Sequence, residues 1–159
     1  MSMDLRVLAA DEVRALARRL LDEGPLLYAV SPAHILADLG WKPLESSATT
    51  VLLADPGLGL GRGRAALNLT DDGTVRSIAT PICDVLPRPI TPEGREFVQD
   101  AFALGGRALA EEFGPAEDTE PGDEPSLAWR RGESTLALSR GRNVVSLHLW
   151  RASDYEDAA

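Results

Sequence analysis

The sequence has 159 residues, 44% of them hydrophobic, which suffices for one core and for burial of roughly 70% of the unfolded surface. Its 25 acidic and 16 basic residues give a formal net charge of −9, which disfavours nucleic acid and anionic lipid and favours a basic protein partner. A single cysteine, Cys83, excludes an internal disulfide and a metal site built from several thiolates.

Two helices are predicted near the N-terminus. Apolar residues recur at helical spacing between Asp11 and Glu23, and a Gly-Pro pair follows and ends this helix. A second helix is predicted to begin after Ser31 as its N-cap, with Pro32 in the first turn, where a missing N–H costs nothing. This helix ends at Gly40, and we expect Trp41 to cover its end.

A central segment then changes to a strand-like pattern. β-Branched and aliphatic residues predict strands over residues 48–54, 63–70 and 74–85. The third strand is expected to be cut short or bulged at Pro81, because proline cannot donate to the ladder. The Asp-Asp-Gly turn at 71–73 is typical of a hairpin, since glycine supplies the positive φ. The segment is therefore predicted to form a three-stranded antiparallel meander.

The longest helix is predicted next. Thr91 caps it, Pro92 occupies its first position, and Gly114 with the following proline ends it. Its buried stripe is expected to consist of Phe97, Ala101, Leu104, Ala108 and Leu109. In the middle of the helix, Gly105 and Gly106 predict either close packing on a sheet or a kink.

An acidic segment separates this helix from the last strands. Residues 116–125 combine five acids with two prolines and a glycine, and we predict that they form an exposed, mobile loop. Strands are predicted over residues 127–131, 134–139 and 143–150, the last with a clear alternation of apolar and polar residues. The acidic tail 151–159 is expected to fray.

This order of elements predicts an α+β fold in one domain over residues 1–159. We expect an antiparallel β-sheet of about six strands, with the long helix packed on one face and two N-terminal helices beside it. No apolar stretch approaches the roughly 18 residues that span a bilayer, and the N-terminus lacks the basic and apolar regions of a signal peptide. The cytoplasm is therefore the expected compartment.

Few residues are candidates for catalysis. The glycine-rich segment 57–64 could cradle a phosphate, but it matches neither the P-loop nor the dinucleotide fingerprint, so a hairpin connection is favoured. His34, His148 and Cys83 lack the sequence context of a catalytic site, and we expect them to be structural. A Ser–His or Cys–His pair formed in space stays open. We therefore predict no enzymatic activity, no metal site and no cofactor.

Charged residues near the C-terminus form the candidate binding site. The acids of segment 116–125 lack the spacing of a calcium-binding loop, so they belong either to a solvated connection or to a docking surface for a basic partner. Arginines and tryptophans in the following strands could hold nucleic acid, but the net charge argues against it and leaves a specific protein contact. The predicted partner-binding residues are Glu117, Asp118, Glu120, Asp123, Glu124, Arg130, Arg140, Arg142 and Trp150.

The chain also resembles a group of known proteins. The resemblance lies in the FVQDAFA run at 97–103, the EFGP end of the long helix, the LAWRR run at 127–131 and the strands with TLAL and VVSL. On these features the chain is similar to small uncharacterised actinobacterial proteins that resemble the immunity partners of secreted polymorphic toxins. The resemblance implies a cytoplasmic inhibitor that occludes a toxin domain, and it assigns no role to any residue; the net charge of −9 favours a basic toxin.

The order of elements is also similar to that of secretion chaperones of the type III class, in which helices flank a twisted antiparallel sheet. By this analogy the chain would bind an extended effector segment. An inhibitor that binds a folded toxin domain is the leading hypothesis, and a chaperone or adaptor is the alternative. A homodimer is compatible with both.

Overall fold

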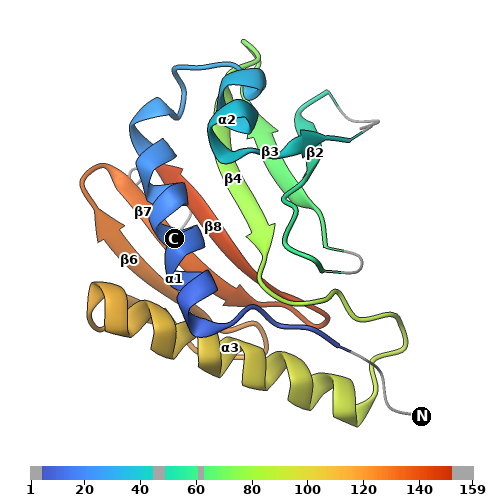
Figure 1. Cartoon of the computed structure of the whole chain (residues 1–159). Coiled ribbons are helices and arrows are strands. Elements are labelled where there is room, and N and C mark those ends of the chain that lie inside the picture. Colours follow the sequence, from blue (N-terminus) through green and yellow to red (C-terminus); the bar gives the residue numbers. More distant parts are fainter. Residues whose placement is uncertain (1–4, 45–48, 61–62, 152–159) are drawn as a thin grey trace.

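The computed structural model describes residues 5–44, 49–60 and 63–151, and Figure 1 shows their arrangement. The helices are α1 (Ala10–Glu23), the 3₁₀ turn η1 (Gly24–Leu26), α2 (Pro32–Leu39) and α3 (Pro92–Phe113). The strands are β1 (Lys42–Pro43), β2 (Val51–Asp55), β3 (Ala65–Leu69), β4 (Val75–Pro81), β5 (Asp118–Glu120), β6 (Ser126–Arg131), β7 (Ser134–Arg140) and β8 (Val145–Arg151). They form one antiparallel sheet in the order β1-β2-β3-β4-β8-β7-β6-β5.

The predicted α+β class is confirmed, but the predicted number of strands is too low, because the described residues form eight. The unpredicted strands, β1 and β5, lie at the two edges of the sheet and are two and three residues long. Neither is long enough to show an alternation of apolar and polar residues. The prediction of a loop over 116–125 is wrong at Asp118–Glu120, which pair with β6. Residue 48 of the predicted first strand and residues 152–159 of the predicted tail lie outside the described residues. Arg151, predicted to begin the tail, instead ends β8.

The helix ends follow the predicted capping residues. The Thr91 hydroxyl accepts a hydrogen bond from the N–H of Gly94 at 3.0 Å and so caps α3. Ser31 stands at the N-cap of α2 without a capping hydrogen bond from its side chain. Gly40 ends α2 with a φ of 71°, a conformation that glycine adopts without strain, and Trp41 is buried beside it.

Both α1 and α3 pack against the same face of the sheet, which we call the covered face (Figure 1). On this face Leu136 and Leu138 of β7 lie opposite Leu149 and Leu147 of β8. All four side chains are 0% exposed. The core therefore lies between the central strands and these two helices. Burial of one such side chain contributes roughly 1.5–3 kcal/mol to stability.

The buried stripe of α3 differs in part from the predicted one. Three of the predicted residues are buried, but Phe97 and Leu104 are only half buried, and Gly105 is buried in their place. A Cβ atom at Gly105 would lie 2.9 Å from Cδ1 of Ile82 and 3.1 Å from Cδ2 of Leu138. The helix therefore approaches the sheet through a glycine, as close packing predicts, and the bulky side chains flank the line of contact.

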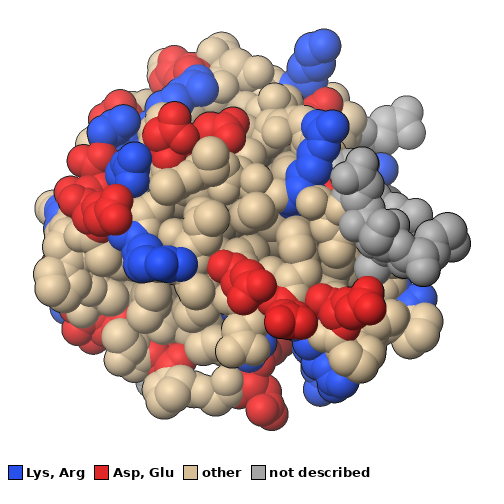
Figure 2. All heavy atoms as spheres, turned by 60° about the horizontal axis from the view of Figure 1, so that its bottom comes forward, with Lys and Arg blue, Asp and Glu red and all other residues tan. Residues whose placement is uncertain are grey.

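The outer side of α3 is charged. Exposed ion pairs join it to α1, among them Arg14 with Glu111 at 2.9 Å, and such exposed pairs contribute little to stability. Figure 2, which brings the lower side of Figure 1 forward, shows acidic and basic side chains interspersed over this side. None of the helices in the described ranges is long and apolar enough to cross a bilayer.

Candidate functional site

The face of the sheet opposite α1 and α3 carries mainly small and polar side chains. Neighbouring residues of a strand point to opposite faces, so these residues alternate with the leucines of the core. We call this face the open face and define it by Asn68, Ser77, Ala79, Ala128, Arg130, Thr135, Ala137, Ser139, Ser146, His148 and Trp150. The register places His148 between Ala79 of β4 and Ala137 of β7. Larger side chains therefore stand next to small ones across the face.

Glu117 and Asp118, two of the predicted binding residues, are paired inside the molecule. The Glu117 carboxylate accepts hydrogen bonds from the backbone N–H of Arg130 at 2.9 Å and from the guanidinium of Arg131 at 2.6 Å. The hydrogen bond from the Arg130 N–H contributes most to lowering the pKa of Glu117, and the bond from Arg131 lowers it further. The Asp118 carboxylate lies 3.4 Å from the Arg130 guanidinium. These contacts hold the segment around β5 against β6.

Glu120, Asp123 and Glu124 form a second acidic group, which we call the acidic corner. All three side chains are exposed, and their carboxylates make no hydrogen bond or ion pair with other described residues. The segment that carries them is nevertheless held in place. Glu120 pairs with Ser126 of β6, and the Arg140 guanidinium donates to the backbone carbonyl of Asp123 at 3.3 Å.

The predicted basic and aromatic binding residues do not form one patch. Arg130 and Trp150 lie on the open face on either side of Thr135, which pairs with both. Arg140 lies at the other end of β7, opposite Val145, and Arg142 is exposed in the turn that follows. The structure therefore brings Arg130 and Trp150 into one row and separates them from Arg140 and Arg142.

The Ser–His pair that the sequence left open is present. Ser139 Oγ lies 2.9 Å from His148 Nε2. Burial lowers the pKa of His148, which keeps the imidazole neutral at neutral pH. Over the described ranges, no carboxylate hydrogen-bonds the second ring nitrogen, so the third group that orients a catalytic histidine is not found there. The pair shares a hydrogen bond whose donor depends on the tautomer of the imidazole.

The other sequence candidates for catalysis, Cys83, His34 and the glycine-rich segment 57–64, do not form a catalytic arrangement among the described residues. Cys83 is buried as predicted, its thiol accepts the N–H of Val145 at 3.4 Å, and burial raises its pKa to about 11. His34 is exposed, 3.5 Å from the carboxylate of Asp38. The described part of the glycine-rich segment joins two antiparallel strands, and Arg62 lies outside the described residues. No cluster of three or more metal-ligating side chains occurs in the part of the chain that the structure describes.

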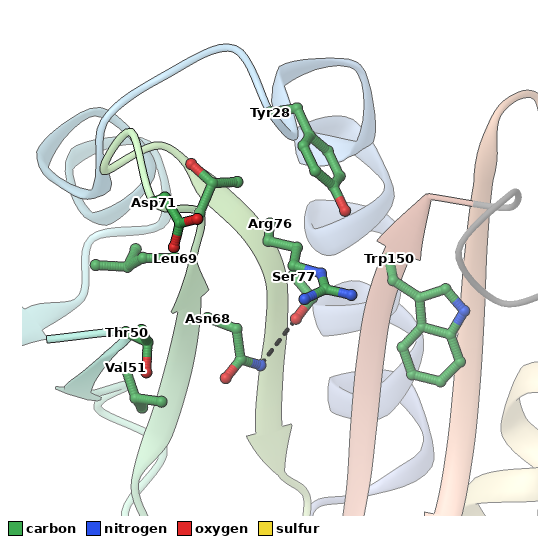
Figure 3. Close-up of a pocket in the computed structure, with 10 residues that line it drawn as sticks. Tyr28, Thr50, Val51, Asn68, Leu69, Asp71, Arg76, Ser77 and Trp150 are labelled. Atoms are coloured by element: carbon green, nitrogen blue, oxygen red, sulfur yellow. Dashed lines mark hydrogen bonds between the residues drawn. The ribbon is translucent and has the colours of Figure 1, made fainter. Parts of the chain in front are cut away.

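A pocket of about 750 Å³ opens on the open face (Figure 3). Its walls come from distant parts of the chain, namely Tyr28 before α2, Val51 of β2, Asn68 of β3, Arg76 of β4 and Trp150 of β8. Trp150 is a predicted binding residue, whereas the other four are not. No motif marks this pocket in the sequence, because sheet pairing brings its residues together from segments that are far apart.

The chain belongs to a family of unknown function, DUF6301, whose model matches residues 11–151. Among solved structures it is similar to the crystal structure of a DUF4309 family protein, YjgB, from Bacillus subtilis subsp. subtilis str. 168. The two share 15% sequence identity with a TM-score of 0.54, over 90% of this chain and 97% of that chain. At this identity the likeness supports the fold alone. No curated protein matches the sequence.

Proposed function

We propose that the protein is a non-enzymatic inhibitor of the immunity class, which binds a basic toxin domain through the acidic corner. The observation that carries this proposal is the state of Glu120, Asp123 and Glu124, which are exposed and have no ion-pair partner among the described residues, on a segment that contacts to its backbone hold in place. Carboxylates held in this way can meet cationic groups without rearrangement. The net charge of −9 adds long-range attraction to a basic partner.

Glu117 and Asp118 have a structural role in this proposal. Glu117 and Asp118 are bound to Arg130 and Arg131, so they position the corner and need not touch the partner. Binding residues commonly sit on connections that a rigid sheet positions, and the corner fits that arrangement.

The form of β5 favours a folded partner over an extended one. β5 is three residues long and carries Asp118 and Glu120, and short, charged edge strands resist the addition of another strand. A chaperone that binds an extended segment would commonly use such strand addition. This edge therefore supports the inhibitor over the chaperone alternative.

The experiment compares two triple variants that remove the same charge from different surfaces. One is Glu120→Gln/Asp123→Asn/Glu124→Gln in the acidic corner. The matched control neutralises Glu93, Glu96 and Asp100 on the exposed side of α3. The partner is captured from the native host and its association is followed by stopped flow. The corner variant should associate roughly 10-fold more slowly at low salt and almost normally at high salt, and the control should stay close to wild type.

Equal on-rates for wild type and the corner variant at low salt would refute the role of the corner. Equal slowing of both variants would show that only net charge matters. Inhibition is tested separately: cells that express the captured partner alone should stop growing, and cells that also express this chain should grow. Growth arrest in both strains would refute the immunity function.

A further inference from the structure

An unusual backbone conformation shapes the pocket on the open face. Tyr28 has a φ of 67°, which is rare for a residue other than glycine. Its N–H donates to the carbonyl of Val75 at 2.7 Å, and the N–H of Val75 donates to Val30 at 3.0 Å. The Arg151 guanidinium lies 4.2 Å from the centre of the Tyr28 ring and donates to Leu27. Conformations of this kind persist where the surroundings fix them and are frequent at ligand sites. The tyrosine ring is thus a fixed wall of the pocket.

Arg76 reaches the pocket from a β-bulge. Strands β3 and β4 pair at Asn68–Ser77 and again at Leu69–Val75, so Arg76 is an extra residue on β4. Bulges redirect a side chain and are frequent beside functional sites. Arg76 is exposed, and its guanidinium makes no hydrogen bond or ion pair with any described residue. Figure 3 shows this guanidinium among the side chains that line the pocket.

The remaining walls combine hydrogen-bond donors with apolar surface. The Asn68 amide donates to the Ser77 hydroxyl at 2.8 Å, which leaves the hydroxyl hydrogen and the second amide hydrogen for a ligand. Val51 and the indole of Trp150 supply apolar area. Asp71 also lines the pocket, and Figure 3 shows it at the β3–β4 turn, away from Trp150.

We propose that this pocket binds a small organic monocarboxylate with an aromatic or branched aliphatic body. The Arg76 guanidinium pairs with the carboxylate, because a planar fork of donors matches its two oxygens. Ser77 and Asn68 supply further donors, and the body of the ligand packs between the aromatic walls. A cavity of about 750 Å³ is of the size that holds such molecules.

The charges of the pocket restrict the ligand further. Asp71 disfavours a second carboxylate at its end of the pocket. A phosphate dianion carries a second negative charge that the Arg76 guanidinium alone does not balance, and no helix N-terminus is among the residues that line the pocket. The site also goes beyond the proposed function, because it lies on the β2-β3-β4 side of β8, whereas the acidic corner lies at β5, across β7 and β6.

The test uses the full chain and 3-phenylpropionate, with binding followed by calorimetry and by NMR of the backbone amides. A dissociation constant of about 1 mM is expected for a ligand of this size, with the largest shifts at Ser77 and Trp150. The neutral 3-phenylpropanamide and the dicarboxylate phenylsuccinate should each bind about 10-fold more weakly, since one lacks the charge and the other meets Asp71. Absence of shifts in the pocket, or equal affinity for acid and amide, would overturn the proposal.

Variants locate the site. Arg76→Gln should weaken binding of 3-phenylpropionate roughly 10-fold, whereas Arg64→Gln, at an exposed arginine that does not line the pocket, should not. Asp71→Asn should strengthen binding of phenylsuccinate only. Unchanged affinity in Arg76→Gln would also overturn the proposal. Neither arginine variant should alter association with the captured partner, so this proposal and that of the acidic corner can fail independently.

Discussion

The two sides of strand β8 show how differently one element is used on the two faces of the sheet. Val145, Leu147 and Leu149 point to the covered face and are 0% exposed. Ser146 and His148 alternate with them on the open face and are only partly buried. The three apolar side chains pack against α1 and α3, whereas Ser146 and His148 point away from this core. Side chains that do not pack against the helices can take part in binding, and Trp150 of β8 lines the pocket on the open face.

The forces on the two faces differ as well. The covered face is stabilised by burial of apolar surface, which has no preferred direction. The open face carries directed hydrogen bonds, such as Asn68 to Ser77 at 2.8 Å and Ser139 to His148 at 2.9 Å. Substitutions on the covered face should therefore change mainly stability, and those on the open face mainly recognition.

The largest expected effect comes from neighbouring substitutions on opposite faces. Leu147→Ala should lower the free energy of unfolding by about 2–5 kcal/mol, because it removes a fully buried side chain opposite Leu138. Ser146→Ala should change it by at most about 0.5 kcal/mol, because the Ser146 hydroxyl makes no hydrogen bond with the described residues. Urea unfolding measures both. Similar losses would mean that the open face is packed as tightly as the covered one.

A smaller effect is expected at Glu23, a buried acid at the end of α1. Burial raises its pKa to about 7 from an ordinary 4.5, and the nearby Asp38 carboxylate adds to the rise. The folded state thus binds this proton more tightly than the unfolded state, so the contribution to stability is present below pH 4.5 and is lost as pH rises through about 7. Glu23→Gln should stabilise the protein by up to about 3 kcal/mol at high pH and by little in acid. The same gain at both pH values would contradict a buried, titrating carboxyl.

The two neighbouring glycines of α3 should respond differently to substitution, because Gly105 lies against the core of the covered face and Gly106 lies beside it. Gly105→Ala would place a Cβ against Ile82 and Leu138, which are both 0% exposed and enclosed by the core, so overpacking should outweigh the helix propensity of alanine by about 1 kcal/mol. Gly106→Ala meets only Leu127 at 3.0 Å, and that side chain is partly exposed and can yield. It should therefore stabilise by about 0.5–1 kcal/mol. Thermal unfolding of both variants checks this, and equal signs would contradict the proposed line of contact.

The buried sides of the helices and strands could be predicted from the sequence in part. The alternation along β8 and the helical spacing in α1 predict their buried sides, because burial selects large apolar residues at the period of the element. In α3 the same rule placed Phe97 and Leu104 in the core, whereas the contact runs through Gly105. A glycine that allows close approach looks in the sequence like any other weak helix former.

The candidate sites were less predictable. The acids of the corner were found from composition, but nothing in the sequence separates the paired Glu117 from the unpaired Glu120. That distinction depends on the position of Arg131 at the end of the neighbouring strand β6. The pocket was missed, because its arginine comes from a bulge at Arg76 and its tyrosine from a rare backbone conformation. Both follow from how strands and loops meet, which local patterns do not encode.

The smallest expected effect concerns His148 on the open face. Burial lowers its pKa below the ordinary 6.5, so the unfolded chain takes up a proton more readily than the folded one. Stability should therefore fall as pH falls through about 6.5, opposite to the effect of Glu23 on the covered side. The two slopes partly cancel in the wild type. In a Glu23→Gln background, where only the histidine slope remains, acidification should destabilise the protein, and adding His148→Gln should flatten the profile. Urea unfolding across this pH range measures both variants. Parallel profiles for the single and the double variant would show that the imidazole is exposed to water and protonates freely in the folded state.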